Sequence, residues 1–150
     1  DRDGEVSFLV SSENTGGSKV AENISSTFEF TYDNPKQIKV PAKKLDTLVG
    51  GKKFDLIVID IEGSEYAALR GMTKLVAQTD RLMIEILPNH IENVGQVKAE
   101  DFFSVLGSKK LARPIDCPDL KKEYKQDEFL DLYAEVKDKY YFSGIDVLFE

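Results

Sequence analysis

Three carboxylates follow or interrupt two apolar runs of the chain. Asp60 and Glu62 follow the run LIVI within FDLIVIDIEGSEYAALRG, residues 54–71, and Glu85 interrupts RLMIEIL, residues 81–87. An acid beside a buried strand loses hydration and needs partners that offset this cost. Carboxylates so placed can take or give a proton, favour a cation, or hold Mg²⁺ through their oxygens. Asp60, Glu62 and Glu85 are therefore candidate catalytic residues.

His90 is the single histidine of the chain and follows the second apolar run, in the segment LPNHIEN. Its position makes it a candidate general base, although a loop histidine can equally be a solvated residue without a role. The acids have structural alternatives as well. Asp60 could hydrogen-bond neighbouring loops, and Glu62 could stabilise a helix N-terminus. The sequence does not decide which of Asp60, Glu62, Glu85 and His90 would remove a proton.

The two apolar runs are predicted to be strands joined by a helix. The near-continuous run at 54–61 is typical of a strand that is buried on both faces of a parallel sheet. Gly63 then turns the chain into a helix, with Ser64 as N-cap and Glu65 in the first turn, where its charge suits the N-terminus. With the strand at 81–87 this makes a βαβ unit. Ligands of open α/β sheets lie beyond the carboxyl ends of the strands, where the candidate residues fall.

Further elements flank this unit. Alternating apolar residues predict strands at 4–10 and 27–32, and Pro41 marks the end or the edge of an extended segment. Helical spacing of apolar residues predicts an amphipathic helix within 119–140, and GIDVLF at 144–149 is a last apolar strand. We expect a single α/β domain, in which helices cover both faces of a mixed sheet.

The composition excludes several classes of protein. A net charge of −7 over 150 residues argues against a nucleic-acid binder, which needs a basic face for phosphates. Cys117 is the one cysteine, so no internal disulfide can form and the fold does not depend on an oxidising compartment. No apolar run approaches the ~18 residues of a membrane span, and no signal peptide is visible. We therefore expect no membrane partner and a cytoplasmic location.

The segment KKLDTLVGGKKFDLIVIDIEGSEYAALRGMTKLVAQTDRLMIEILP resembles the hallmark segment of FkbM-type methyltransferases. That family shows a Leu-Asp pair, a buried strand ending in Asp-Val-Glu-Gly-Ala-Glu, a helix ending in Leu-Arg-Gly, and an apolar strand containing Ile-Glu. The matching residues here are Leu45 with Asp46, residues 60–65, residues 69–71, and Ile84 with Glu85. The stretch before this block and the last strand are also similar to the family.

The resemblance implies a Rossmann-like enzyme that depends on S-adenosylmethionine and methylates a hydroxyl of a sugar or secondary metabolite. It implies that Asp60 and Glu62 face the methyl donor and the acceptor, which is a small molecule or glycan, and that Asp1 and Asp60 contact the cofactor. The family carries a glycine-rich loop after its first strand and an acid after its second, and neither occurs here. We therefore expect residues 1–150 to be the C-terminal portion of the domain, with an incomplete sheet, and to be inactive and weak in cofactor binding alone.

The implied strand order places the strand at 55–60 between the family's first strand, which is missing, and the strand at 82–87. The missing neighbour would leave an apolar edge that can pair with another chain. We expect two copies to pair through this edge, or the strands at 4–10 and 27–32 to cover it.

Two other interpretations stay open at the level of the sequence. The acids at 60, 62 and 85 could hold Mg²⁺ in an enzyme of another class. The missing glycine loop and the charged segment at 119–140 would also suit a non-catalytic Rossmann-like module that binds a partner.

Overall fold

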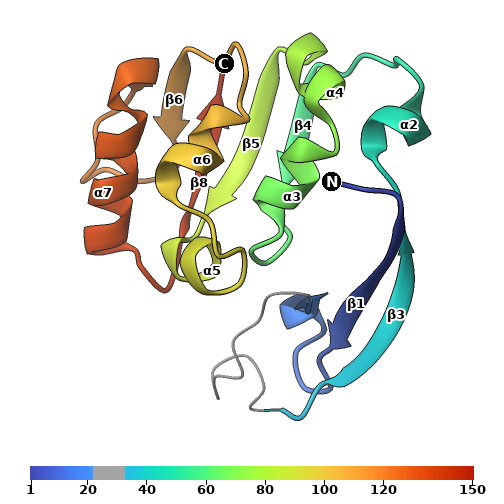
Figure 1. Ribbon diagram of the computed structural model, residues 1–150. Helices are drawn as coiled ribbons and strands as arrows, with labels where there is room; N and C mark the ends of the chain where they lie inside the picture. Colours follow the sequence, from blue (N-terminus) through green and yellow to red (C-terminus); the bar gives the residue numbers. More distant parts are fainter. Residues whose placement is uncertain (22–32) are drawn as a thin grey trace.

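The computed structural model describes residues 1–21 and 33–150, which form two sheets (Figure 1). The smaller sheet is antiparallel with the order β2-β1-β3, and its strands are β1 (Gly4–Val10), β2 (Lys19–Val20) and β3 (Lys36–Ala42). The strand predicted at 4–10 is confirmed. Pro41 lies in β3, an outer strand of this sheet, where its missing N–H need not break a ladder. The strand predicted at 27–32 lies outside the described residues.

Within the described residues, the larger sheet has five strands in the order β4-β5-β8-β6-β7. Its strands are β4 (Leu56–Ile59), β5 (Arg81–Ile86), β6 (Leu111–Pro114), β7 (Tyr124–Lys125) and β8 (Ile145–Phe149). β4 and β5 are parallel, and β8 runs antiparallel to both β5 and β6. The predicted βαβ unit, the pairing of its two strands and the apolar last strand are therefore confirmed.

Short helices connect the strands. They are α2 (Leu45–Val49), α3 (Glu65–Arg70), α4 (Thr73–Gln78), α5 (Pro88–Asn93), α6 (Ala99–Ser104) and α7 (Phe129–Lys139), with 3-10 turns at Thr15–Gly17 and Gln126–Glu128. The helical spacing after Gly63 is divided between α3 and α4, because the chain turns at Gly71, where a Cβ atom would lie 3.3 Å from the backbone nitrogen of Asp1. The helix expected within 119–140 is shorter than predicted, since Tyr124 is buried and pairs with β6.

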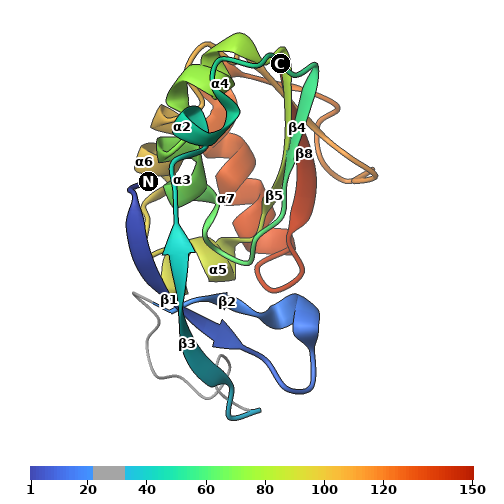
Figure 2. The ribbon, with the colours of Figure 1, turned by 90° about the vertical axis from the view of Figure 1, so that its right-hand side faces the viewer.

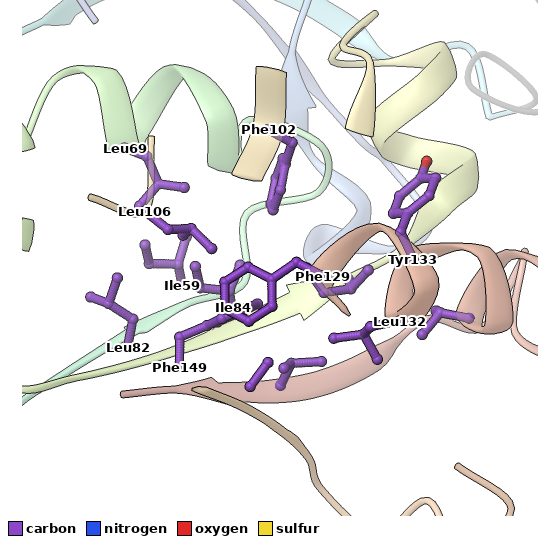
Figure 3. Close-up of a cluster of buried hydrophobic side chains, with 14 of the residues drawn as sticks. Ile59, Leu69, Leu82, Ile84, Phe102, Leu106, Phe129, Leu132, Tyr133 and Phe149 are labelled. Atoms are coloured by element: carbon purple, nitrogen blue, oxygen red, sulfur yellow. The ribbon is translucent and has the colours of Figure 1, made fainter. Parts of the chain in front are cut away.

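The core lies between the larger sheet and its helices (Figure 3). Alternate residues of the central strands point toward the helices and are buried: Leu82, Ile84 and Ile86 of β5, with Val147 and Phe149 of β8. Leu69 of α3, Phe102 of α6, and Phe129 and Leu132 of α7 meet them from above. The core thus rests on one face of the sheet.

The opposite face of the sheet is open, so the expectation of helices on both faces is wrong for the described residues. Figure 2 shows the helices on one side of β4, β5 and β8, and on the other side Leu56 is 42% and Val58 57% exposed. The topology explains this arrangement. The parallel pairs β4/β5, β5/β6 and β7/β8 are joined by crossovers, which are right-handed by strong rule. The crossover from β7 to β8 moves across the sheet in the opposite direction to the other two, and its strands also run opposite to β4, β5 and β6. The two reversals cancel, so all three crossovers place their helices on the same face.

β4 lies at an edge of the larger sheet and pairs with β5. The prediction that these two strands are neighbours in the sheet is confirmed. β1 does not cover β4, because it pairs with β2 and β3 in the smaller sheet, so that alternative is wrong for the strand at 4–10. Pairing of two copies through β4 stays a prediction.

Asp46 joins α2 to the start of α4. Its Oδ1 accepts a hydrogen bond from the backbone N–H of Leu75 at 3.0 Å, and its Oδ2 accepts one from the N–H of Lys74 at 3.0 Å. These are N–H groups of the first helical turn, which have no partner within the helix. The acid of the Leu-Asp pair therefore caps a helix that begins 27 residues later, through a contact at Thr73 as well.

We predict that Asp46→Ala lowers the free energy of unfolding by about 1 to 2 kcal/mol, because it removes a capping side chain. Asp46→Asn, which keeps one acceptor oxygen, should lose less. Urea unfolding followed by circular dichroism measures both, with Asp55→Ala in the exposed loop before β4 as control. An Asp46→Ala variant that unfolds at the same urea concentration as the parent would contradict the capping role.

Candidate functional site

A buried carboxylate holds the turn that follows β4. Glu65 is only 3% exposed, and its Oε1 accepts hydrogen bonds from the N–H of Ile61 at 3.0 Å and of Gly63 at 3.2 Å. Burial raises the pKa of Glu65, and the backbone hydrogen bonds oppose that shift. The structural role expected for Glu65 is present, but it acts on N–H groups ahead of α3 and so fixes the turn itself.

Two successive residues of this turn have left-handed backbone angles. Glu62 has φ 57° and Gly63 has φ 92°. At Gly63 a Cβ atom would lie 2.7 Å from Cβ of Val94 and 3.0 Å from the carbonyl oxygen of His90. Only glycine fits so close to α5. A left-handed glutamate is uncommon, and such backbone gathers at functional sites. The turn thus packs Glu62 against the helix that carries His90.

Glu62 and His90 meet at the carboxyl ends of β4 and β5. Oε2 of Glu62 lies 3.1 Å from Nδ1 of His90. Burial and, next, the charge of Lys19 lower the pKa of His90 to about 4. Burial raises the pKa of Glu62, and Lys19 opposes that shift. A neutral imidazole held by a carboxylate is an arrangement that can accept a proton.

Asp60 and Glu85 belong to a row of acids on the open face of the sheet. Ile59 pairs with Ile84, so the next residues, Asp60 and Glu85, are neighbours across β4 and β5. Glu85 also pairs directly with Asp146 of β8. Like charges placed opposite each other destabilise a sheet. Burial, then repulsion by Asp60 and the other nearby acids, raises the pKa of Glu85 to about 7.

Asp1 lies apart from this group. Its carboxylate contacts Nη1 of Arg70 at 3.3 Å and Nη1 of Arg2 at 3.6 Å. Arg70 ends α3, whereas Asp60 precedes the start of that helix. The six residues of α3 span about 9 Å at 1.5 Å per residue. The structure therefore brings Glu62 to His90 and places Asp60 and Glu85 as neighbours near Glu62. It does not bring Asp1 to them.

A cavity of about 420 Å³ lies between the smaller sheet, helix α3 and residues 94–97, which follow α5. Its walls are mainly apolar and include Val6, Val20, Ile61 and Val94, with Asp1 and Arg70 at its border. Ile61 and Gly63 line it, so the turn that carries Glu62 also forms one wall. A bound molecule in this cavity would therefore lie beside the turn.

Lys19 and Asp146 belong to the site and were not singled out from the sequence. Lys19 sits in β2 and is only 8% exposed, although lysine is rarely buried without partners. Its charge acts on both Glu62 and His90. No local pattern marks Lys19, because β2 precedes the rest of the site by more than forty residues in the sequence. Asp146 did carry a signal, since it interrupts the last apolar strand much as Glu85 interrupts β5.

Among residues 1–21 and 33–150, no group of three or more His, Cys, Asp or Glu side chains is arranged to hold a metal ion. The Mg²⁺ interpretation therefore gains no support from the acids near β4 and β5. Within the same residues, no helix has the length and apolar character needed to cross a membrane.

The model of the methyltransferase FkbM domain matches residues 1–138. The chain belongs to the FkbM methyltransferase family. No curated protein and no solved structure matched the chain. The resemblance drawn from the Leu-Asp and Asp-Ile-Glu-Gly-Ser-Glu segments is confirmed, and several residues of those segments now have a physical role. Asp46 caps α4, Glu65 holds the turn, and Gly63 allows its contact with α5.

The raised pKa of Glu85 makes the stability of this FkbM domain depend on pH. The folded state holds the proton of Glu85 up to a pKa of about 7, whereas the unfolded chain releases it near the usual 4.5. Stability from this group is therefore lost as the pH rises from about 4.5 to about 7. We predict that Glu85→Gln, which cannot ionise, raises Tm at pH 8 and has little effect at pH 5.

Differential scanning calorimetry at both pH values measures this effect. Glu5→Gln, an exposed acid of β1, serves as the matched control and should change Tm by the same small amount at each pH. A Glu85→Gln variant whose Tm differs from the parent by an equal amount at pH 5 and pH 8 would contradict the assigned ionisation.

Proposed function

We propose that this FkbM domain transfers a methyl group from S-adenosylmethionine to a hydroxyl of a sugar or secondary metabolite. His90 acts as general base in this proposal, and Glu62 orients it. The observation that carries the proposal is the 3.1 Å contact between Glu62 and His90 where β4 and β5 end. This is the edge at which open α/β sheets bind their ligands.

The acids beside this pair fit one end of the cofactor. S-adenosylmethionine supplies an electrophilic methyl group on a sulfonium cation. Asp60, Glu62 and Glu85 lie together and repel one another, so a cation near them would be stabilised. No such support exists for binding of the nucleotide end, because the sequence carries no Gly-x-Gly segment after an apolar strand. These residues therefore support the sulfonium end of the cofactor.

The protein has two tasks in such a transfer. It must hold the acceptor oxygen in line with the methyl carbon, and it must remove the hydroxyl proton. The negative charge of Glu62, whose Oε2 lies 3.1 Å from Nδ1 of His90, favours a proton on that nitrogen, and in this proposal Nε2 is the basic atom. Because the pKa of His90 is lowered to about 4, the ring is neutral at pH 7, the form that can accept a proton, although its basicity is reduced.

Asp60 and Glu85 have a separate role in the proposal. Asp60 is exposed at the end of β4, where it can face the cation, and its charge contributes to the raised pKa of Glu85. The support for an assembly of two copies is the open edge of β4 with its exposed Leu56 and Val58. Neither the acceptor nor a second copy is needed to explain the contact of Glu62 with His90.

We predict that His90→Gln lowers the rate of methyl transfer by about 10² to 10⁴-fold, the usual contribution of a general base. Glu62→Gln should lower it less, because the ring remains but is oriented less well. Both variants should unfold within a few degrees of the parent. Labelled methyl transfer from S-adenosylmethionine to a panel of sugars and other hydroxyl compounds measures the rate. The parent in this assay is the full-length protein that carries the domain, because residues 1–150 alone are expected to be inactive.

Glu5→Gln is the control and should keep the parent rate. No transfer to any hydroxyl compound by the parent protein would contradict the proposed reaction. Parent-like rates in His90→Gln would leave the reaction in place and contradict the role of His90.

A further inference from the structure

A buried lysine lies in the smaller sheet, next to the site formed by the larger one. Lys19 belongs to β2, which is held against β1 by pairing of Leu9 with Lys19 and of Phe8 with Val20. The side chain is nearly enclosed, at 8% exposure. Figure 2 shows β2 just below α5, the helix of His90. A lysine in such a place must be compensated by acids.

Among residues 1–21 and 33–150, the acids that act on Lys19 include Glu62, at the turn after β4, and Asp33, in the loop before β3. Asp33 is already engaged, because its Oδ2 accepts hydrogen bonds from Oγ of Ser11 at 2.5 Å and from the N–H of Ser12 at 2.8 Å. Glu62 is half-buried and contacts His90 on its other side. Glu62 is thus placed between a cation of the smaller sheet and an imidazole of the larger one.

From this arrangement we infer that Lys19 is a positioning residue of the active site, whose buried side chain brings a positive charge to the contact between Glu62 and His90. The inference rests on the proposed function for its role in methyl transfer, and on the cluster alone for its electrostatic effect. It also gives the smaller sheet a task, since β1 and β3 hold the strand that brings Lys19 to the site.

Within the part of the chain that the structure describes, Lys19, Glu62 and Asp60 contribute to the charge around His90. Lys19 disfavours the protonated ring, and Glu62 favours it through contact at Nδ1. Asp60 acts on Glu62 and raises the pKa of that carboxylate, whereas Lys19 lowers it. Removal of the lysine charge therefore has a definite sign. It raises the pKa of His90, and it raises the pKa of Glu62.

The chain offers a direct way to measure this effect, because His90 is its single histidine. The imidazole can be titrated by NMR without ambiguity and without any substrate. Lys19→Met removes the charge and keeps the apolar length of the side chain, and Lys19→Arg keeps the charge. Lys39→Met, at an exposed position of β3, is the matched control.

We expect Lys19→Met to raise the pKa of His90 by at least half a unit, and Lys19→Arg and Lys39→Met to leave it near the parent value. The acid limb of the rate profile in labelled methyl transfer should move upward in pH by the same amount in Lys19→Met. Circular dichroism establishes that each variant is folded. Lys19→Gln replaces Lys19→Met in the same titration where the apolar variant does not fold.

A folded Lys19→Met or Lys19→Gln protein whose His90 titrates as in the parent would overturn the inference. So would a Lys19→Arg protein that titrates like Lys19→Met, because the effect would then not depend on charge. Absence of methyl transfer in the parent would contradict the proposed function and leave the titration result intact, so the two failures can be told apart.

Discussion

The two hydrogen bonds from Ile61 and Gly63 to the buried carboxylate of Glu65 are the constraint on which the site depends. They satisfy backbone N–H groups just where the chain leaves β4 and turns into α3. A short helix of six residues contributes little stability by itself, so its start must be fixed by such contacts. With the turn fixed, Glu62 follows in a left-handed conformation and reaches His90.

The packing of Gly63 adds a second constraint on the same turn. Val94 fills the space that a side chain at residue 63 would need, so the turn and α5 fit together without a gap. This contact ties the end of β4 to the helix that follows β5. The distance between Glu62 and His90 is thus set by packing on one side and by hydrogen bonds on the other. Acids crowded at this edge carry an electrostatic cost, which the structure tolerates at Glu85 by raising its pKa.

Much of the larger sheet could be predicted from the sequence, because its signals are local. Each of these signals lies within a few consecutive residues. They are the apolar runs of β4 and β5, the glycine after β4 and the acids at the strand ends. The family, the βαβ unit and the grouping of Asp60, Glu62, Glu85 and His90 followed from them. The two-faced burial inferred for β4 failed, because an apolar run does not say which face the helices will cover. Leu56 and Val58 are exposed for that reason.

Other features depend on contacts between distant segments and left no local signal. Lys19 gains its place only when the smaller sheet packs near α5, and Asp46 caps a helix that lies well downstream of it. Asp1 was expected at the cofactor and instead contacts Arg70 at the far end of α3. The break between α3 and α4 could not be predicted either, since the helical spacing of apolar residues continues across Gly71 although the helix is interrupted there.

Hydrogen exchange at the amides of Ile61 and Gly63 tests the central claim most directly. If Glu65 holds the turn, both amides exchange slowly in the parent protein and much faster in Glu65→Ala, while the amides of β5 and β8 keep their protection. Fast exchange at Ile61 and Gly63 in the parent, or unchanged slow exchange in Glu65→Ala, would show that Glu65 does not fix the turn.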